Sequence, residues 1–414
     1  MSTTPARITI VTAGHLSNCP RMLKAADALH DEGYRVRVVS VSHTAWSAEA
    51  DRALRATRPW AWTIVDYARD SARLTQLLTG ARFHAARRLS RWLGPERVPM
   101  ATAARACGRA HSELVRAAVA APADFVYGGS TGALAATAES AGLLGVPYGL
   151  DLEDFHSAEE AGPSGARGGA LVERVERHIL AGARVLTASS PMISEEYTKK
   201  YRVRPLTIHN TFSLERDVPE PSAPHGPLRV YWFSQTLGPT RGLEVLVQAF
   251  GRADVAGELH LRARIVPAFF DQLQRLQRDV APALTLVPLE PAPPDDMVKL
   301  AQTYDAGWSG EELSFPNRAW CLGNKIFTYL AAGVPVILSR TPAQTALARD
   351  LGEAAFAFDD VEHLAQLLRE LAADPARRCR ARRAARAAAE RRWHWEHPAD
   401  RGALLSAVAA GTGR

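Results

Sequence analysis

A repeated alternation of short apolar strands and helices constrains the fold of this chain more than any other feature. A β-branched run at 8–12 leads into a helical period at 21–29, and a valine-rich run follows at 35–41. Strand, helix and strand within about 35 residues form a βαβ unit, which requires a parallel sheet. Further strands are predicted at 124–127, 147–150, 184–188 and 206–209. We predict that 51–119 is mostly helical, and that 159–169 is a loop rich in glycine and alanine.

Four prolines between 215 and 227 interrupt the alternation, which then starts again. The second series of predicted strands lies at 228–233, 258–265, 284–287, 305–308, 334–338 and 354–358. We therefore predict an α/β fold of two Rossmann-like domains facing across a cleft. The predicted boundaries are 1–212 for the N-terminal domain, 213–227 for a Pro-rich linker, 228–390 for the C-terminal domain and 391–414 for a final helical segment.

The composition is that of a globular protein rather than a disordered or membrane-spanning one. The 414 residues are 47 % hydrophobic and 23 % charged, enough for two or three domains. The net charge of +6 suits a protein that meets phosphates. The four cysteines are far apart and form no CxxC pair, which favours reduced thiols. No signal peptide or long apolar run is visible, so we expect a cytoplasmic protein, with any membrane contact peripheral, at the inner membrane surface.

A long helical pattern at 375–395 carries most of the positive excess. Its arginines are Arg377, Arg378, Arg380, Arg382, Arg383, Arg386, Arg391 and Arg392. A solvated alanine–arginine face is the ordinary interpretation, and a patch for anionic lipid or a polyanion is the alternative. We therefore include peripheral membrane contact through 375–392 among the hypotheses. No nucleic-acid recognition module is visible, so no nucleic-acid partner is expected.

Three compact nucleotide-binding and metal-binding motifs do not occur in this sequence. Neither half contains GxGxxG, GxxxxGK[ST] or HExxH. This disfavours a dinucleotide enzyme, a P-loop enzyme and a zinc protease. Ligand-binding residues should instead be distributed over the loops at the carboxyl ends of the parallel strands.

Two loops of the C-terminal half suit a phosphate ligand. The loop at 233–242 supplies small residues and places Arg241 just before a helix, although an ordinary βα turn with an exposed arginine would look the same. The second places Gly323, Asn324 and Lys325 at or near a helix start. Free backbone N–H groups, an amide and an ammonium group at that place suit a diphosphate.

An acidic loop follows the predicted strand at 147–150. It holds Asp151, Glu153, Asp154 and His156 within six residues. Facing a cleft, such groups take a proton from an acceptor hydroxyl or stabilise a positive sugar carbon. Helix capping and solvated charge are the alternative. Asp151 and Glu153 also imitate the D-x-D motif of metal-dependent single-domain transferases, against which two complete Rossmann-like halves argue.

Several motifs, in order, resemble those of GT-B glycosyltransferases related to glycosyltransferase family 4. The stretch 323–336 (GNKIFTYLAAGVPV) looks like the family pattern P-N-K-x-x-E-Y-x-A-x-G-x-P-V. The segments 232–236 and 241–244 resemble its G-R … K-G loop, and 173–190 resembles its E-R … A-D-x-V-I-T-x-S element. Asn210 is similar to the asparagine of its interdomain I-x-N-G motif.

The resemblance implies a hexosyltransferase that moves a sugar from a nucleoside-diphosphate donor to an acceptor hydroxyl, with retention. It also implies that no metal and no separate cofactor are needed, because cationic side chains and helix N-termini neutralise the leaving diphosphate. The N-terminal domain would bind the acceptor and the C-terminal domain the donor. The final helix at 391–414 would cross back to the N-terminal domain.

The resemblance also assigns residues to roles. Arg241, Asn324 and Lys325 would contact the diphosphate, and backbone groups near Leu289 the nucleobase. The remaining donor-side residues are Ser234, Gln235, Gly323 and Thr328. The acidic loop, Asp151, Glu153, Asp154 and His156, would act at the sugar. The acceptor-side residues are His15, Ser17 and Asn18, in the loop after the first strand.

The chain departs from the family pattern at the donor side. Thr328 replaces the ribose-binding glutamate, Gln235 replaces the arginine of G-R, and Arg241 replaces the lysine of K-G. Glu153 stands where the family has a histidine. Loss of one arginine weakens phosphate neutralisation unless Arg318 compensates.

Two further hypotheses share this architecture. A nucleotide-sugar 2-epimerase would act on the donor alone. A non-catalytic relative acting as a binding protein is motivated by Thr328 and Gln235. For the transferase, the expected acceptor is a small molecule, a glycan or a lipid-linked sugar.

Overall fold

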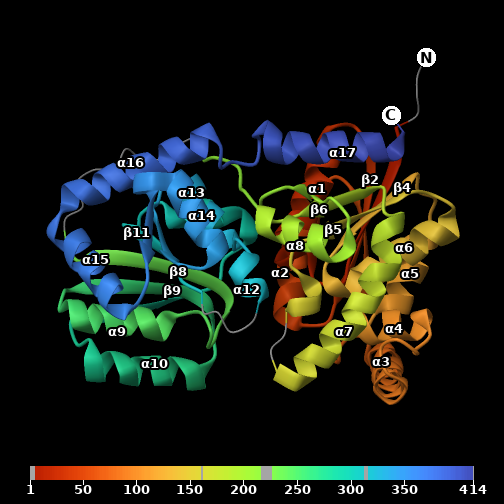
Figure 1. Cartoon of the computed structure of the whole chain (residues 1–414), viewed down its shortest axis with the longest axis horizontal. Coiled ribbons are helices and arrows are strands. Elements are labelled where there is room, and N and C mark those ends of the chain that lie inside the picture. Colours follow the sequence, from red (N-terminus) through yellow and green to blue (C-terminus); the bar gives the residue numbers. More distant parts are fainter. Residues whose placement is uncertain (1–4, 160–161, 216–225, 312–315, 414) are drawn as a thin grey trace. The chain divides into compact units, whose positions relative to one another are not determined.

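A computed structural model describes residues 5–159, 162–215, 226–311 and 316–413, with the side chains of 162–167 left out. The chain divides into two compact units (Figure 1), and each is described by itself. Unit 1 runs to His209 and also includes Asn317 and the segment from Pro398 onward. Unit 2 comprises the rest of the chain between Asn210 and His397. Most of the predicted linker, 216–225, lies outside the described residues.

Unit 1 is built on a seven-stranded parallel sheet with the order β3-β2-β1-β4-β5-β6-β7. Its strands are β1 (Arg7–Thr12), β2 (Arg35–Ser42), β3 (Ala61–Asp66), β4 (Phe125–Gly129), β5 (Tyr148–Leu152), β6 (Val185–Ala188) and β7 (Leu206–Thr207). β4 is buried along its whole length, which is typical of a parallel strand covered on both faces.

Helices cover both faces of this sheet. The helices of unit 1 are α1 (Pro20–Asp31), α2 (Ala45–Thr57), α3 (Arg73–Leu93), α4 (Met100–Cys107), α5 (His111–Val119), α6 (Thr131–Leu144), α7 (Gly162–Ile179), α8 (Pro191–Tyr201) and α17 (Ala403–Thr412). α5 and α6 pack on β1, β2 and β4 through one apolar cluster. α8 begins at a side-chain cap, since the Ser190 hydroxyl accepts from the N–H of Ile193 and Pro191 is the first helical residue.

The segment from Pro398 onward belongs to unit 1, and its helix is α17 rather than one helix over 391–414. α17 contacts α1, β5 and β6, and buries Leu404 and Val408. Just before it, the buried Asp400 carboxylate accepts from the N–H of His209 at 2.9 Å.

Unit 2 has a six-stranded parallel sheet with the order β10-β9-β8-β11-β12-β13. Its strands are β8 (Leu228–Leu237), β9 (Gly257–Ile265), β10 (Leu284–Leu289), β11 (Ala306–Ser309), β12 (Val336–Ser339) and β13 (Ala355–Phe358). Its helices are α9 (Leu243–Ala253), α10 (Pro267–Val280), α11 (Met297–Ala301), α12 (Asn317–Trp320, whose first residue belongs to unit 1), α13 (Asn324–Ala331), α14 (Pro342–Leu351), α15 (Val361–Ala373) and α16 (Pro375–Arg391). α9 and α10 lie on one face of the sheet and α13 and α14 on the other (Figure 1).

Two predictions of secondary structure were wrong, and one strand was missed. The region 51–119 is mostly helical, as predicted, but it also contains β3, an edge strand that the surrounding alanines and arginines conceal. The loop predicted at 159–169 is helical from Gly162, where α7 begins. β8 continues to Leu237 instead of ending at 233, because a bulge at 234–235 lets the strand resume pairing with β9.

The cysteine prediction and the membrane prediction can be compared with the structure directly. None of the four cysteines of the sequence forms a disulfide. Within the described residues, none of the helices is both long and apolar enough to cross a membrane.

Candidate functional site

In unit 2 the candidate site begins where the strand order reverses. β8 and β11 are neighbours, and the chain leaves them toward opposite faces of the sheet, which is where ligands bind in open α/β folds. The turn after β8 has two residues in the left-handed region, Thr240 at φ 67° and Gly242 at φ 64°. The indole N–H of Trp308, on β11, donates to the carbonyl of Arg241 at 3.0 Å. The turn therefore holds Arg241 at the carboxyl edge of the sheet.

Three cations gather around one carboxylate at this edge. Arg318 forms an ion pair with Glu311, which follows β11. Burial lowers the pKa of Arg241, and the charge of Arg318 lowers it further. Burial likewise lowers the pKa of Lys325 to about 8; Glu311 raises it, whereas Arg241 and Arg318 lower it. We call Arg241, Arg318 and Lys325 the cation cluster. Its three positive charges outnumber the one negative charge of Glu311 by two, so the cluster favours an anionic ligand.

Two helix N-termini border the cation cluster. α9 begins after Gly242 and α13 after Gly323, and in neither case does a side chain of the described residues cap the first turn. Glycine at this position leaves the first N–H groups open to a ligand. The side-chain oxygen of Asn324 accepts from Asn210, so Asn324 offers an anion its backbone N–H rather than this oxygen.

The other predicted donor-side residues fall in different places. Ser234 and Gln235 form the bulge in β8, with Gln235 exposed. Leu289 ends β10, two strands away from β8 on the same carboxyl edge. Thr328 is buried, and its hydroxyl donates to the carbonyl of Asn324 within α13 at 3.1 Å. The structure thus gives Thr328 a packing role and not an exposed ligand-binding face.

In unit 1 the segment predicted as an acidic loop begins inside β5, and its first residue, Asp151, is part of a buried ion pair. The two carboxylate oxygens of Asp151 accept from Nε and Nη2 of Arg21 at 2.7 and 2.5 Å. The hydroxyl of Thr187 donates to the same carboxylate at 2.5 Å. Burial lowers the pKa of Arg21, but the charge of Asp151 and its hydrogen bond raise it by more, so the guanidinium keeps its charge. These contacts fix Asp151 in place, and the catalytic role predicted for it stays a prediction.

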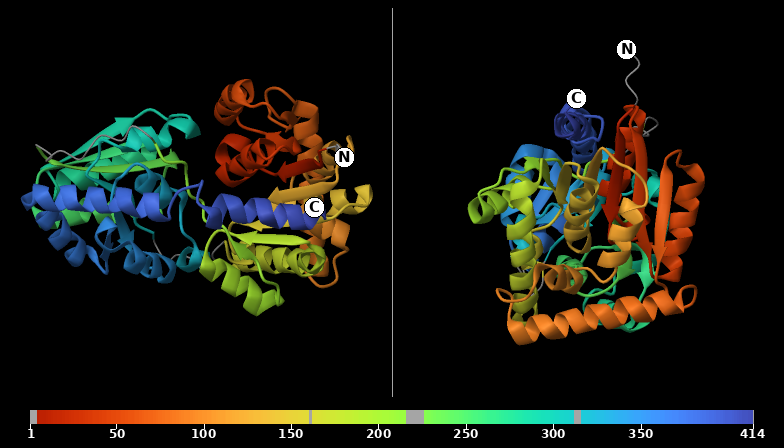
Figure 2. Two further views of the ribbon diagram at one scale, coloured as in Figure 1. Left: turned by 90° about the horizontal axis from the view of Figure 1, so that it is seen from above. Right: turned by 90° about the vertical axis from the view of Figure 1, so that its right-hand side faces the viewer.

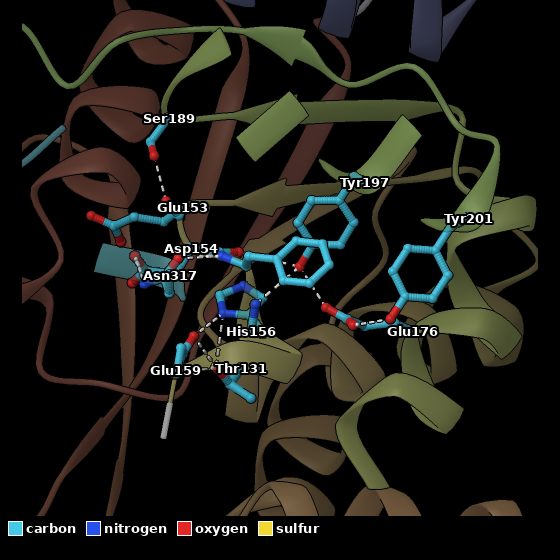
Figure 3. Close-up of polar contacts among 11 residues, drawn as sticks. Thr131, Glu153, Asp154, His156, Glu159, Glu176, Ser189, Tyr197, Tyr201 and Asn317 are labelled. Atoms are coloured by element: carbon cyan, nitrogen blue, oxygen red, sulfur yellow. Dashed lines mark hydrogen bonds and ion pairs between the residues drawn. The ribbon is translucent and has the colours of Figure 1, made fainter. Parts of the chain in front are cut away.

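Asp154 is also held by hydrogen bonds. Asn317, far along the sequence, donates from its amide to the Asp154 carboxylate at 2.8 Å and accepts from the N–H of Phe155 at 2.8 Å (Figure 3). The backbone carbonyl oxygen of Asp154 lies 3.2 Å from the Tyr197 hydroxyl oxygen. Asn317 is thus a site residue that the sequence did not reveal.

Glu153 differs from its neighbours because its carboxylate accepts no hydrogen bond from the described residues. Its backbone carbonyl accepts from Ser189, which fixes the main chain, while the side chain extends away from the other labelled residues (Figure 3). Burial and the charges of Asp154 and Asp151 raise the pKa of Glu153 to about 7; Arg21 and His156 oppose the rise. A carboxylate with a pKa near neutrality is suited to general-base catalysis.

His156 lies under the loop and is charged. Its Nδ1 contacts Glu159 and the Thr131 hydroxyl, the latter at 2.9 Å. Burial lowers the pKa of His156, but the Glu159 charge and hydrogen bond outweigh it, with help from Glu176, and raise it to about 9. His156 is 4 % exposed, so its side chain packs beneath the surface and holds the loop in place instead of contacting a ligand.

A second buried carboxylate, Glu176 on α7, completes this support. Tyr197 and Tyr201 on α8 donate to it at 2.5 and 2.6 Å (Figure 3). The Tyr197 hydroxyl also accepts from the N–H of His156 at 3.3 Å. Glu176 lies in the segment that carries the family resemblance, and an acidic residue on the buried face of a helix was the signal that could have identified it.

The predicted acceptor-side residues after β1 serve the local fold. His15 is buried; its Nδ1 lies 2.7 Å from Asp51, and its Nε2 accepts from the N–H of His43 at 3.0 Å. The second Asp51 oxygen accepts from the N–H of Ser17, and Asn18 donates to Ser47 of α2. Both ring nitrogens of His15 are therefore engaged within the fold, and the acceptor-side role predicted for it stays a prediction.

Asp151 and Glu153, which resemble a D-x-D motif in sequence, do not form a metal site with other described residues. Among the described residues no group of three or more His, Cys, Asp or Glu side chains is placed to hold a metal ion.

The arginines of α16 largely pack against unit 2 rather than forming an open patch. Arg378 is buried and pairs with Asp305 at 3.2 Å. Arg382 donates to the carbonyl of Gln302 at 2.5 Å, and burial lowers its pKa. Arg377, Arg380 and Arg386 pair with acidic residues of α15 or α16 or with Asp374 between them. The sequence pattern at 375–392 therefore reflects packing and ion pairing more than an exposed basic surface.

Comparison with known proteins connects this architecture to one class. The family described as glycosyl transferase-like matches residues 256–402, within which Lys325 and Arg318 lie. No curated protein matches the chain significantly.

Solved structures match both units over almost the whole chain. Anabaena Alr3699/HepE, solved in complex with UDP and glucose, aligns at a TM-score of 0.68 with 14 % identity, covering 99 % of each chain. A glycosyltransferase from Rickettsia africae aligns at 0.66 with 12 % identity and 99 % of each chain. SnogD from Streptomyces nogalater, also a glycosyltransferase, aligns at 0.51 with 21 % identity over 98 % of this chain and all of the other.

These findings show the fold and one family-like region. The chain has the GT-B fold, with two parallel-sheet α/β units, and residues 256–402, which cover much of unit 2, are glycosyl transferase-like. The activity, the donor and the acceptor are taken up below.

Proposed function

We propose that the protein transfers a sugar from a nucleoside-diphosphate donor to an acceptor hydroxyl, and that unit 2 binds the donor. The observation that carries this proposal is the cation cluster at the switch point of unit 2, two charges in excess and bordered by two uncapped helix N-termini. A diphosphate matches this arrangement in charge and in its number of acceptor oxygens.

Uridine diphosphate is the first nucleotide to test. Anabaena Alr3699/HepE was solved with UDP and with UDP-glucose, and it shares the fold at 14 % identity. We propose that backbone groups near Leu289, on the same edge of the sheet, meet the base.

Glu153 is proposed as the group in unit 1 that takes the proton from the acceptor hydroxyl. Its free carboxylate and its pKa of about 7 support this role, while Asp151, Asp154 and His156 hold the loop around it. We also propose that no metal is needed, because the cation cluster can neutralise the leaving diphosphate, and that the anomeric configuration is retained, as the sequence resemblance implies.

The test measures nucleotide binding and turnover separately. Calorimetry with UDP should show at least 30-fold weaker binding for Lys325→Ala, since a charge-assisted hydrogen bond is worth about 2 kcal/mol. Lys299→Ala, an exposed lysine of the same unit, is the matched control. Unchanged UDP affinity in Lys325→Ala would remove the diphosphate assignment.

Turnover distinguishes the transferase from its alternatives. UDP-sugars are incubated with and without an acceptor panel, with added chelator, and the products are analysed by NMR. Glu153→Gln should lower turnover about 100-fold or more at unchanged UDP affinity, whereas Glu49→Gln, an exposed carboxylate of unit 1, should not. An epimer formed without acceptor would indicate the 2-epimerase. UDP binding without any product would indicate the non-catalytic relative.

A further inference from the structure

Helix α3 of unit 1 presents its large apolar side chains outward. Leu74, Leu78 and Trp92 are 72 %, 54 % and 81 % exposed, and Leu77 and Leu89 are exposed as well. The face of α3 that is buried consists of small or polar residues, Thr79, Gly80, Ala86 and Ser90. A helix of a globular protein normally buries its apolar stripe, so this helix is the reverse of the usual arrangement.

The exposed apolar residues form one continuous stripe. They recur at spacings of three and four residues, which places them on one side of the helix. The apolar stripe consists of Leu74, Leu78, Ala81, Ala85, Leu89 and Trp92. Figure 2 shows α3 as a long, straight helix along the outer edge of unit 1, in the orange part of the sequence.

Basic residues accompany the apolar stripe, and acidic residues are absent from the helix. α3 carries Arg73, Arg82, Arg87, Arg88 and Arg91 over its 21 residues and contains no aspartate or glutamate. Arg73, Arg87, Arg88 and Arg91 are exposed. A basic helix with an exposed Leu/Trp face lies in the headgroup region of a bilayer with its apolar side chains among the acyl chains.

A hollow beside the stripe adds a place for a phosphate-bearing headgroup. It measures about 330 Å³ and is lined by guanidinium and hydroxyl groups together with apolar side chains of α3. The lining residues include Arg82, Arg105, Thr102, Ser112 and Leu89. Arg82 forms an ion pair with Glu113 and Arg105 donates to Ser112, so both guanidinium groups are held in place.

We propose that α3 docks unit 1 on an anionic lipid surface. A second copy of the chain is the less suitable occupant, because pairing two α3 helices would bring two rows of arginines together without a carboxylate on either helix. Docking through α3 replaces the hypothesis of membrane contact through 375–392, whose arginines are largely engaged within unit 2.

The experiment is sedimentation of the full chain with vesicles of equimolar phosphatidylglycerol and phosphatidylcholine, compared with pure phosphatidylcholine. The protein should bind the anionic vesicles at least tenfold more strongly. Leu78→Ser with Trp92→Ser should abolish binding. Leu143→Ser, which alters a leucine of α6 that is 66 % exposed, should leave it unchanged. Binding should also protect the fluorescence of Trp92 from an aqueous quencher.

A second pair of variants tests the electrostatic part. Arg88→Gln with Arg91→Gln should weaken binding roughly 25-fold. Arg383→Gln with Arg391→Gln, which removes two exposed charges of α16, should have little effect. The proposal fails if the native chain ignores anionic vesicles, if both lipids bind it equally, or if the α16 variant loses as much as the α3 variant. A native dimer in sedimentation velocity that Leu78→Ser with Trp92→Ser dissociates would favour a second copy instead.

Discussion

The pKa of Lys325 predicts how donor binding depends on pH. Burial among like charges lowers this pKa to about 8, so in the free protein the ammonium group loses its proton between about pH 7 and 9. A bound diphosphate places negative charge beside the ammonium group and restores its pKa toward the ordinary value. UDP therefore binds the charged form, and its affinity must fall as pH rises through about 8.

The size of the effect follows from the fraction of charged lysine. With a pKa of about 8, Lys325 is about 90 % charged at pH 7 and about 10 % charged at pH 9. If the lysine stays charged in the complex, UDP affinity is about tenfold weaker at pH 9 than at pH 7.

Calorimetry at pH 6, 7, 8 and 9 measures this dependence directly, including the protons taken up on binding at pH 8. Lys325→Arg is the decisive comparison, because arginine keeps its charge at every pH in the series. The affinity of Lys325→Arg for UDP should depend little on pH. Any pH dependence that remains comes from titration of UDP itself. Equal slopes in the native protein and in Lys325→Arg would refute the reasoning.

Three other predictions concern unit 1 and the donor turn. Asp151→Ala leaves its buried arginine partner unpaired and should cost about 3–5 kcal/mol in urea unfolding; a loss below about 1 kcal/mol would contradict the structural role. His156 has a pKa of about 9 in the folded protein, above its ordinary value, so its protonation stabilises the folded state. This stabilisation is complete below about pH 6.5 and is lost as pH rises through 9. Glu159→Gln should make urea midpoints less dependent on pH over that range, and an unchanged dependence would count against the pair. Gly242→Ala, at φ 64°, should weaken UDP binding, whereas Gly145→Ala, at φ 67° in unit 1, should affect only stability.

The sequence predicted most of the fold because its strands and helices follow strong local patterns. The apolar strands of both sheets are short and β-branched, and the helix start at Asn324 follows Gly323, where the sequence predicted a helix to begin. β3 escaped prediction because an edge strand buries only part of one face. α7 escaped because its first turns contain four glycines and a proline between 162 and 169, which local propensity assigns to a loop.

The candidate site was predictable where its functional residues are neighbours in the sequence. Gly323 and Lys325 could be identified because a helix start is a local feature. The partner of an ionisable side chain is a tertiary property, so the sequence could not separate Asp151, which is paired with Arg21, from Glu153, which accepts no hydrogen bond from described residues. Asn317 lies 163 positions from Asp154, and no local pattern connects them.

The distribution of unit 1 along the chain determines when it can be completed during synthesis. Asp400, which accepts from His209, and helix α17 are made last, after nearly 190 residues of unit 2 have left the ribosome. At roughly 5–20 residues per second, this interval lasts about 10–40 s. During that time the nascent first unit lacks its final helix, and the apolar surface that Leu404 and Val408 later cover is exposed to chaperones. A chain that stops before residue 398 would remain in that condition permanently.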